Sequence, residues 1–411
     1  MSQQSPAPVK YDILSPAFFA DPYPTLDRMR TEDPVYWHPQ LMSWVLTRYD
    51  DIQKVLRDAG TKFSAKRVEQ YSVGAPESVQ DKLRVCNQFF GICVAFVDPP
   101  QHARLRALVS RALTVQAVER MRPQIQAMVD ALLAGPLGRG RIDIIADLAG
   151  PLPLHVFAAL MGVPEADIPL LKGYVAQINR LFGAGLVAAE DVEACHAGIV
   201  GFYEYFNAYI AQRRISPTED LLSNLIAARV DNALLTDDEL VAMAVTLMIG
   251  GHETTTHMIG NGVLALLRNP EQLRKLRETP ELLDGAVEEM MRYDGPTLST
   301  FRRAAVDNEE FDGVKIAAGD FVLSMLYGAN RDPKRFTEPE RFDIERPDNR
   351  HMSFSGGIHT CPGAALSRLQ ARVAISSLLA AAPELRLDTD APEWMPHMMI
   401  RGVRALPVIL G

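Results

Sequence analysis

One cysteine, Cys361, lies in a run of residues suited to presenting a reactive sulfur, Phe354-Ser-Gly-Gly-Ile-His-Thr-Cys-Pro-Gly363. His359 is close to it, an apolar helical stretch begins just after it, and the next acidic residue is Glu384. Nearby cations and the amide dipoles of a helix N-terminus both favour a thiolate. The flanking glycines let the backbone approach a large flat group. A lone cysteine in a glycine turn is more often inert, but this run fits a thiolate beside a large flat group such as the face of a haem.

A long helix with an unusual centre is the second feature. Thr236-Asp-Asp-Glu239 is a capping box and Asn269-Pro270 is a stop, so about 30 residues span about 45 Å. Its middle, residues 250–257, reads Gly-Gly-His-Glu-Thr-Thr-Thr-His, where a helix favours leucine and alanine. Each glycine costs about 1 kcal/mol relative to alanine. Such a sequence indicates a function for the centre of the helix.

The pair His252 and His257 also suggests a zinc metallopeptidase. That motif needs two histidines at positions i and i+4 of one helix face. Here they are at i and i+5, about 140° apart around a helix. We therefore reject a zinc site and expect packing or polar roles for both.

Two further charged patterns are weak when taken alone. Glu289 and Arg292 are three positions apart on a predicted helix, a spacing that usually means an exposed ion pair. His102 and Arg106 are four apart on another helix face, and cations of this kind could neutralise buried carboxylates.

The composition predicts one large globular unit. The chain has 411 residues, of which 47% are hydrophobic and 23% charged, so it can bury a large core. Residues 135–140, Gly-Pro-Leu-Gly-Arg-Gly, form the best candidate boundary, but we interpret them as a turn. We expect a single domain over residues 1–411.

The charge, the cysteines and the N-terminus restrict the cellular role. A net charge of −9 gives no electrostatic basis for binding nucleic acid. The four cysteines have no disulfide or zinc-like spacing, which suits a reducing cytoplasm. The N-terminus is polar, without a signal sequence or an apolar span. We expect a cytoplasmic protein without a membrane anchor.

The local patterns predict mostly helices, with small strands near both ends of the chain. We expect helices after Asp21-Pro22, after Asp50 and after a cap at Asp98-Pro99-Pro100, and recurring helical segments to about residue 290. The expected strands are residues 35–38 and 43–47, paired as a hairpin, and residues 313–316 and 320–323.

The spacing Phe-x-x-Gly-x-His-x-Cys-x-Gly resembles the signature of the cytochrome P450 family, and the similarity extends over nearly the whole chain. The resemblance implies a mainly α fold with small β regions, in which haem b lies between a long distal helix and a proximal cysteine loop. It makes Cys361 the ligand of the iron, with Phe354 and Gly363 beside the haem. A thiolate ligand favours O–O cleavage.

Residues 250–255 match the family's distal motif, Ala/Gly-Gly-x-Asp/Glu-Thr-Thr/Ser. The match implies that Thr254 hydrogen-bonds oxygen species bound at the iron and that Glu253 relays protons from solvent, as general acid–base chemistry requires. The alternative is a threonine that bonds back to its own helix and bends it.

The resemblance also assigns roles to the charged patterns. Glu289 and Arg292 become a buried structural pair, joined by Arg341 from a later meander. The haem propionates are expected to contact His102, Arg106, Arg303 and His359. Arg302 is adjacent to Arg303, and the spacing to the following residues favours Arg303.

The substrate residues follow from the family topology alone. They come from the segment before Asp98, the long helix, the stretch after Pro296 and a late turn. Their mostly apolar character implies a lipophilic substrate such as a terpenoid, steroid, fatty acid or polyketide. The set is Phe90, Val94, Thr246, Ile249, Gly250, Leu298, Ser299, Met399 and Ile400.

The implied activity is monooxygenation of a small hydrophobic molecule, with dioxygen and two electrons. NAD(P)H is expected to supply them through a separate ferredoxin reductase and an acidic ferredoxin, drawn to a positive face formed by Arg350, His351, His359, Arg368 and Arg372. The alternatives are a peroxide-dependent peroxygenase, which has no need of the Glu253–Thr254 pair, and a non-catalytic haem or ligand-binding protein, which has no use for a proton relay.

Overall fold

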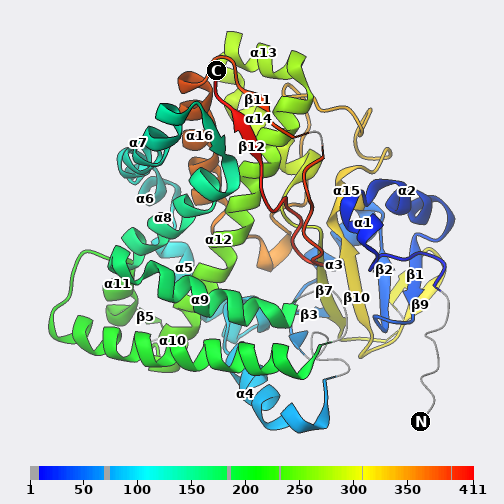
Figure 1. Cartoon of the computed structure of the whole chain (residues 1–411). Helices are drawn as coiled ribbons and strands as arrows, with labels where there is room; N and C mark the ends of the chain where they lie inside the picture. Colours follow the sequence, from blue (N-terminus) through cyan, green and yellow to red (C-terminus); the bar gives the residue numbers. More distant parts are fainter. Residues whose placement is uncertain (1–8, 69–74, 183–186, 231–232, 308, 390) are drawn as a thin grey trace.

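The fold is known from a computed structural model that describes residues 9–68, 75–182, 187–230, 233–307, 309–389 and 391–411 (Figure 1). The first eight residues, on which the expectation of a missing signal sequence rests, lie outside the described residues. Helices make up most of the fold, as expected, and small sheets lie to one side and at one end.

The α-helices follow the capping and stop signals of the sequence in most places. They are α1 (Pro16–Ala20), α2 (Tyr23–Glu32), α3 (Tyr49–Arg57), α4 (Gln80–Phe90), α5 (Gln101–Ala112), α6 (Val115–Arg120), α7 (Arg122–Arg139), α8 (Pro151–Met161), α9 (Ile168–Asn179), α10 (Ala189–Ile215), α11 (Leu221–Ala227), α12 (Asp237–Arg268), α13 (Pro270–Glu278), α14 (Leu283–Asp294), α15 (Leu326–Asn330) and α16 (Ala364–Ala381).

Short 3₁₀ and π segments join several of these helices. The 3₁₀ segments are η2 (Glu77–Val79), η3 (Val94–Phe96), η5 (Glu165–Asp167), η6 (Arg180–Phe182), η7 (Pro280–Leu282) and η8 (Gly357–His359), and η4 (Ile144–Ala149) is a π-helix that leads into α8.

The strands are β1 (Val35–His38), β2 (Ser43–Leu46), β3 (Phe63–Ser64), β4 (Arg141–Asp143), β5 (Arg229–Val230), β6 (Ala233–Leu234), β7 (Ser299–Ala304), β8 (Glu309–Phe311), β9 (Val314–Ile316), β10 (Phe321–Met325), β11 (Arg386–Leu387) and β12 (Pro407–Ile409). The largest sheet has the order β1-β2-β10-β7-β3. The sequence predicted small strands near both ends of the chain, and the structure shows that this sheet joins them.

The predicted hairpin is confirmed. β1 and β2 pair antiparallel, with Val35 opposite Leu46 and His38 opposite Ser43, and β2 then pairs parallel with β10. Antiparallel β7 is the other neighbour of β10, so the hairpin and β7 lie in one sheet (Figure 1).

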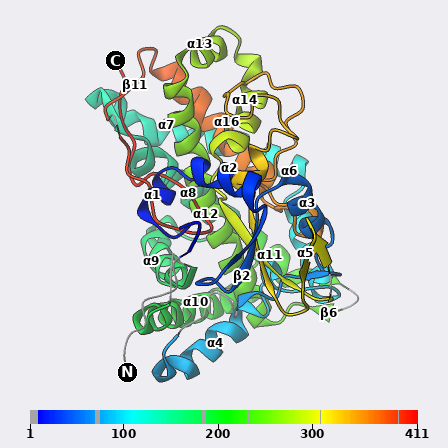
Figure 2. The same ribbon diagram turned by 90° about the vertical axis from the view of Figure 1, so that its right-hand side faces the viewer.

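The long helix α12 runs through the middle of the molecule in both views (Figures 1 and 2). The Thr236 hydroxyl accepts from the Glu239 amide at 3.2 Å and the Glu239 carboxylate accepts from the Thr236 amide at 3.1 Å, so the predicted capping box forms. The helix ends at Arg268, before Asn269-Pro270, as predicted. It packs against α8, α14 and α16, which fixes the distal motif relative to the cysteine loop.

One local prediction was wrong. Residues 135–140 do not form a turn, because α7 continues through Pro136 to Arg139 and ends at Gly140, whose φ is 67°. Burial of Leu133 and Pro136 in the core outweighs the loss of one helical hydrogen bond at proline. The predicted start of α5 is confirmed, because the helix begins directly after Asp98-Pro99-Pro100 with Pro100 as the N-cap residue, while the Asp98 side chain accepts from the Ser64 hydroxyl at 2.5 Å and the Ala65 amide at 2.8 Å.

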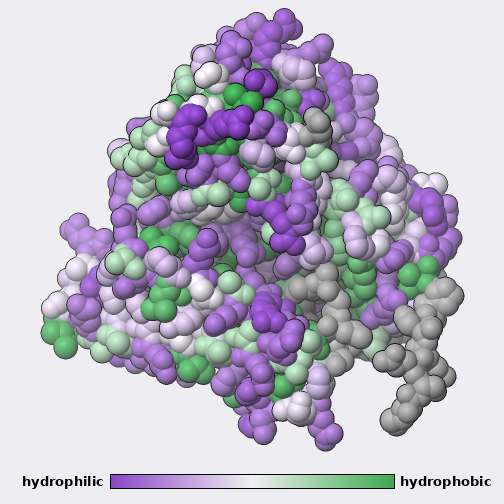
Figure 3. Space-filling view, viewed as in Figure 1, coloured by the Kyte–Doolittle hydropathy of each residue, from purple (hydrophilic) through white to green (hydrophobic). Residues whose placement is uncertain are grey.

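An apolar helical stretch is mostly buried, and much of the surface is hydrophilic (Figure 3). One helical stretch among the described residues, Ile144–Met161, is long and apolar enough to cross a membrane by length and composition, and 56% of it is buried inside the protein. Its side chains, including Leu148, Leu152 and Val156, pack in a core cluster with α12 and α16. On the face in Figure 3, hydrophilic residues dominate the upper part and hydrophobic residues form separate small patches.

Candidate active site

The cysteine loop places Cys361 between η8 and the N-terminus of α16. The Cys361 amide donates to the Phe354 carbonyl at 2.9 Å, which closes the loop. Gly357 has a φ of 63°, and a Cβ there would come within 2.1 Å of the Leu56 carbonyl oxygen. Only glycine fits this position, so the second glycine of the run serves the packing of the loop against α3.

Opposing effects act on the Cys361 thiol. Burial raises its pKa, while the amides of Gly363 and Ala364 and the charges of Arg106 and Arg368 act in the opposite direction. The helix start and the nearby cations are the features that the sequence predicted, and they point at the sulfur.

Two adjoining cavities meet at this sulfur. A cavity of about 210 Å³ is lined by Cys361 and Gly363 and, from α12, by Gly250 and Gly251. A Cβ on either glycine of α12 would meet nothing within 4 Å, so both face open space. A second cavity, of about 150 Å³, is lined by Cys361, Phe354 and Thr254. An open space between a cysteine loop and a glycine-containing helix face fits a flat group ligated by the sulfur.

A cluster of bases lies at one end of the larger cavity. The rings of His102 and His359 are 4.2 Å apart, and Arg106 lines the same cavity. Burial and the nearby charge of Arg302 lower the pKa of both histidines, that of His359 to about 2. Nε2 of His359 is buried and has no hydrogen-bond partner within the described chain. Buried guanidinium groups need counter-charges, and the two carboxylates of a haem fit this cluster.

Arg302, not Arg303, belongs to this cluster, so the prediction for Arg303 was wrong. Successive side chains of β7 face opposite sides of the sheet. Arg302 is buried, with 2% of its surface exposed, on the side of the two histidines. Arg303 lies on the other side, where its Nε donates to the Gly319 carbonyl at 3.3 Å and its guanidinium lies over the Phe321 ring.

Arg67 is a further cation that the sequence did not reveal. It is 6% exposed, its Nη1 donates to the carbonyls of Ala65 at 3.0 Å and Ala95 at 2.8 Å, and it lies over the Phe96 ring. Its charge also lowers the pKa of His359. In the sequence, Lys66-Arg67 has no feature that distinguishes it from an ordinary pair of solvent-exposed cations.

Thr254 lies at the wall of the cavities and bonds back to its own helix. Its hydroxyl donates to the Gly250 carbonyl at 2.5 Å, while α12 stays helical through the glycines. Because the hydroxyl proton is used in this bond, the oxygen faces the cavity as an acceptor. Thr256 makes the same back bond to His252, at 3.0 Å, but lines a different cavity.

Glu253 faces away from Cys361, into a cavity of about 460 Å³ that it shares with His155, Lys172, His252 and His257. Burial raises its pKa, and the neighbouring Asn179 side chain opposes this rise. Burial also lowers the pKa of His252 and of His257 to about 4, so both rings are neutral. Asn179 itself lines the cavity that contains Thr254. Glu253 therefore lies between Thr254 and the cavity of about 460 Å³, which we call the polar cavity.

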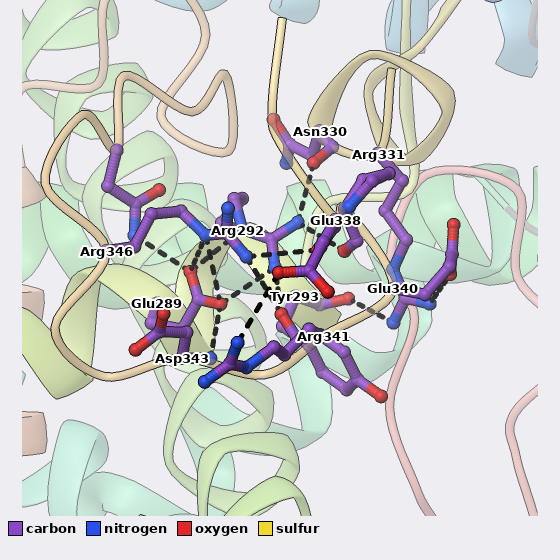
Figure 4. Close-up of polar contacts among 12 residues, drawn as sticks. Glu289, Arg292, Tyr293, Asn330, Arg331, Glu338, Glu340, Arg341, Asp343 and Arg346 are labelled. Carbon is purple, nitrogen blue, oxygen red and sulfur yellow. Dashed lines mark hydrogen bonds and ion pairs between the residues drawn. The ribbon is translucent and has the colours of Figure 1, made fainter. Parts of the chain in front are cut away.

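The Glu289 carboxylate is at the centre of a buried network (Figure 4). Both of its oxygens accept from Arg292, each at 2.8 Å, and neither side chain is exposed. The third member is Arg346, whose Nε donates to both oxygens at 3.3 and 3.2 Å.

The expectation that Arg341 completes this network was wrong. The Arg341 side chain is 58% exposed and pairs with Glu338, and its carbonyl oxygen, not its guanidinium, accepts from Arg292 and Arg346. The side chain of Arg341 points outward, and the side chain of Arg346, five residues later, points back to Glu289 (Figure 4). Sequence spacing alone does not determine which arginine of an irregular segment points inward.

Most of the predicted substrate residues meet at one cavity of about 200 Å³, lined by Phe90, Thr246, Ile249, Gly250, Met399 and Ile400. Val94 and Ser299 line the two cavities at Cys361. Leu298 is fully buried in the core and lines none of these three cavities, so its prediction was wrong. Nine further residues line the cavity of Phe90, and the sequence did not single them out as substrate residues: Arg67, Cys93, Ala95, Phe96, Asn179, Phe182, Val245, Thr297 and His397.

The predicted positive face is largely neutralised by ion pairs. Arg368 binds Glu288 with contacts of 2.5 and 2.7 Å, and Arg372 binds Asp284 at 2.8 Å and Glu119 at 3.3 Å. Arg350 is paired with Asp348, and the buried His351 ring contacts Glu288 at 3.2 Å. The segment from 350 to 383 has no acid of its own, but α14 and the end of α6 bring acids to it.

The chain resembles cytochromes P450 over its whole length. Residues 189–382 match the family model described as Cytochrome P450. Cytochrome P450 monooxygenase PikC of Streptomyces venezuelae is 40% identical over 98% of this chain and 94% of its own. Vitamin D(3) 25-hydroxylase of Pseudonocardia autotrophica is 35% identical, over 98% and 97%.

The solved structures agree. P450BioI, in complex with acyl carrier protein ligated to hexadec-9Z-enoic acid, superimposes with a TM-score of 0.89 at 35% identity, over 96% of this chain and 99% of that one. Because these similarities agree with the cysteine loop and the distal helix, the chain belongs to the cytochrome P450 family. It is a bacterial-type monooxygenase, an oxidoreductase that uses a haem iron and dioxygen.

Proposed function

We propose that this protein hydroxylates or epoxidises a small lipophilic substrate, using Cys361 as the haem ligand and Thr254 and Glu253 for proton delivery. The observation that carries the proposal is that Cys361 and Thr254 line the same cavity. The bound haem–thiolate would activate dioxygen so that one atom enters a substrate bond and the other leaves as water, with two electrons and two protons consumed.

The four bases His102, Arg106, Arg302 and His359 hold the two carboxylates of the cofactor in this proposal. Two guanidinium groups balance two carboxylates, and the neutral histidines donate hydrogen bonds without further charge. Arg67 adds a third positive charge nearby. Glu289, Arg292 and Arg346 act indirectly, by fixing the segment that leads to the cysteine loop.

Glu253 moves protons from the polar cavity toward Thr254. Because burial raises its pKa, its carboxyl can carry a proton closer to neutral pH than an exposed glutamate can. The Thr254 oxygen then accepts a hydrogen bond from a protonated group in the cavity, since its own proton is donated to Gly250.

This arrangement favours dioxygen over the alternatives. A peroxide-dependent enzyme receives its protons with the peroxide, and a non-catalytic haem protein needs no relay. Neither has a use for a buried carboxyl between a polar cavity and a threonine at the haem cavity.

We propose that the chain works as one domain in the cytoplasm and receives electrons from NAD(P)H through a ferredoxin reductase and a ferredoxin. Family membership supports this proposal. The ion pairs of Arg368 and Arg372 mean that encounter with the ferredoxin does not depend on those two arginines.

The test compares two threonines that make the same bond to their own helix. Thr254→Ala and Thr256→Ala are each supplied with ferredoxin, reductase, NADPH and a substrate found by its Soret shift. If Thr254 serves oxygen chemistry, Thr254→Ala loses about 10-fold or more of its product per electron to hydrogen peroxide, and Thr256→Ala stays within about twofold of wild type. Equal losses in both variants would mean that the hydroxyl only shapes the helix. Unchanged coupling in both would remove the proton role.

A further inference from the structure

His397 is a polar side chain at the wall of the cavity lined by Phe90, Phe182, Ile249 and Met399, where Arg67, Asn179 and three threonines are the other polar residues. Thr254 lines the same cavity. A group fixed here therefore lies where a substrate must be bound for oxidation. Aromatic and aliphatic walls give affinity for lipophilic molecules in general, whereas a fixed polar group selects among them.

The proton of the His397 ring is confined to one nitrogen. Nδ1 accepts hydrogen bonds from the amides of Met399 and Ile400, each at 3.1 Å. A nitrogen that accepts from amides carries no proton, so the neutral ring holds its proton on Nε2. Burial lowers the pKa of His397 to about 4, which keeps the ring neutral near pH 7.

The turn that carries the ring is itself held in place. The Leu298 amide donates to the Met399 carbonyl at 2.9 Å, the Ser299 hydroxyl donates to the Met398 carbonyl at 2.6 Å, and the Arg401 amide donates to the Pro296 carbonyl at 2.8 Å. The ring therefore keeps its orientation before a ligand arrives, and a pre-organised donor loses little entropy on binding.

The Nε2–H group donates to no side chain or carbonyl of the described residues, although it lies in a mostly apolar wall. A donor in such surroundings is poorly satisfied until a ligand supplies an acceptor. Asn179 and Arg67 line the same cavity, Asn179 beside the Glu253 carboxylate and Arg67 with its Nη1 bonded to two backbone carbonyls.

We propose that His397 determines specificity by donating a hydrogen bond from Nε2 to a carbonyl oxygen of the substrate. The substrate is then a lipophilic ketone, ester or lactone rather than a plain hydrocarbon. This inference rests on the proposed function, because it takes the cavity beside Thr254 as the substrate site.

The experiment measures binding of two matched probes, cyclododecanone and cyclododecane, to the haem-containing enzyme by calorimetry. The two ligands have nearly the same ring, so the ratio of their affinities reports the carbonyl alone. The variant His397→Ser removes the Nε2–H donor of the ring, and the oxygen of the shorter serine side chain can still accept from the two amides of the turn.

The wild type is expected to prefer the ketone by about 10-fold, and His397→Ser is expected to lose this preference while binding the hydrocarbon within about twofold of wild type. A wild type without preference, or a variant that keeps it, would overturn the proposal. If the variant does not fold, the ¹⁵N shifts of the His397 ring in the wild type decide, because a proton on Nδ1 would equally refute it. Calorimetry requires no turnover, so its outcome is independent of the Thr254 coupling test.

Discussion

Replacing Arg346 by methionine tests the assignment of the third residue in the Glu289 network. Arg346 makes two long bonds to Glu289, at 3.3 and 3.2 Å, and three to backbone carbonyls between 2.7 and 3.3 Å. Breaking a buried ion pair by removing one partner costs about 3–5 kcal/mol. Here Arg292 still holds both carboxylate oxygens, so we expect a cost of about 2–3 kcal/mol.

For 411 residues, an unfolding entropy of about 2.1 cal/mol/K per residue converts that cost into a fall in Tm of about 3 °C. Thermal unfolding followed by circular dichroism measures it. The matched control is Arg341→Met, which removes an exposed pair with Glu338 and leaves the backbone carbonyl in place, so its Tm stays within about 1 °C of wild type. A larger loss in the Arg341 variant than in the Arg346 variant would refute the assignment.

Three further predictions follow from the site. Arg302→Gln is expected to release haem to apomyoglobin about 10-fold faster than wild type, because a charge-assisted hydrogen bond to the haem is lost. The release rate of Arg303→Gln is expected to stay within about twofold of wild type. Equal rates in the two variants would contradict the placement of Arg302 beside the haem. His257 has a pKa lowered to about 4, so its contribution to stability is complete above the unfolded pKa of about 6.5 and is lost as the pH falls toward 4. His257→Gln therefore reduces acid destabilisation between these pH values, by up to about 3 kcal/mol in urea titrations, and an unchanged pH profile would show that the ring is not buried neutral. Arg372→Gln changes the salt dependence of reduction by an acidic ferredoxin by less than about twofold, because the guanidinium is already paired; a larger change in stopped-flow rates would restore the docking role.

The parts of the site that local chemistry determines were predictable from the sequence. The capping box at Thr236 set the start of α12, and the run around Cys361 set the loop. In both cases the interacting groups are close in the chain, so spacing is enough to predict the geometry.

The errors concern choices that depend on distant elements. Whether Arg302 or Arg303 lies on the side of His102 and His359 depends on the register of β7 with β10. Arg346 takes the place predicted for Arg341 because the irregular segment between them turns. The prediction of a positive face was wrong for the same reason, because Glu288 on α14 pairs with Arg368 although the two residues are 80 positions apart in the chain. His397 carries no sequence motif, and only the folded turn shows that its Nδ1 is already used.

The central claim, thiolate ligation by Cys361, is tested most directly by the absorption spectrum of the reduced protein under carbon monoxide. The wild type is expected to show the strongly red-shifted Soret band that a thiolate ligand gives, and Cys361→His is expected to lose it while still binding haem. Cys93→Ala is the control, because Cys93 is also buried and lines the neighbouring cavity, and it should keep the band. A wild type without the band, or a Cys361→His variant that retains it, would contradict the account.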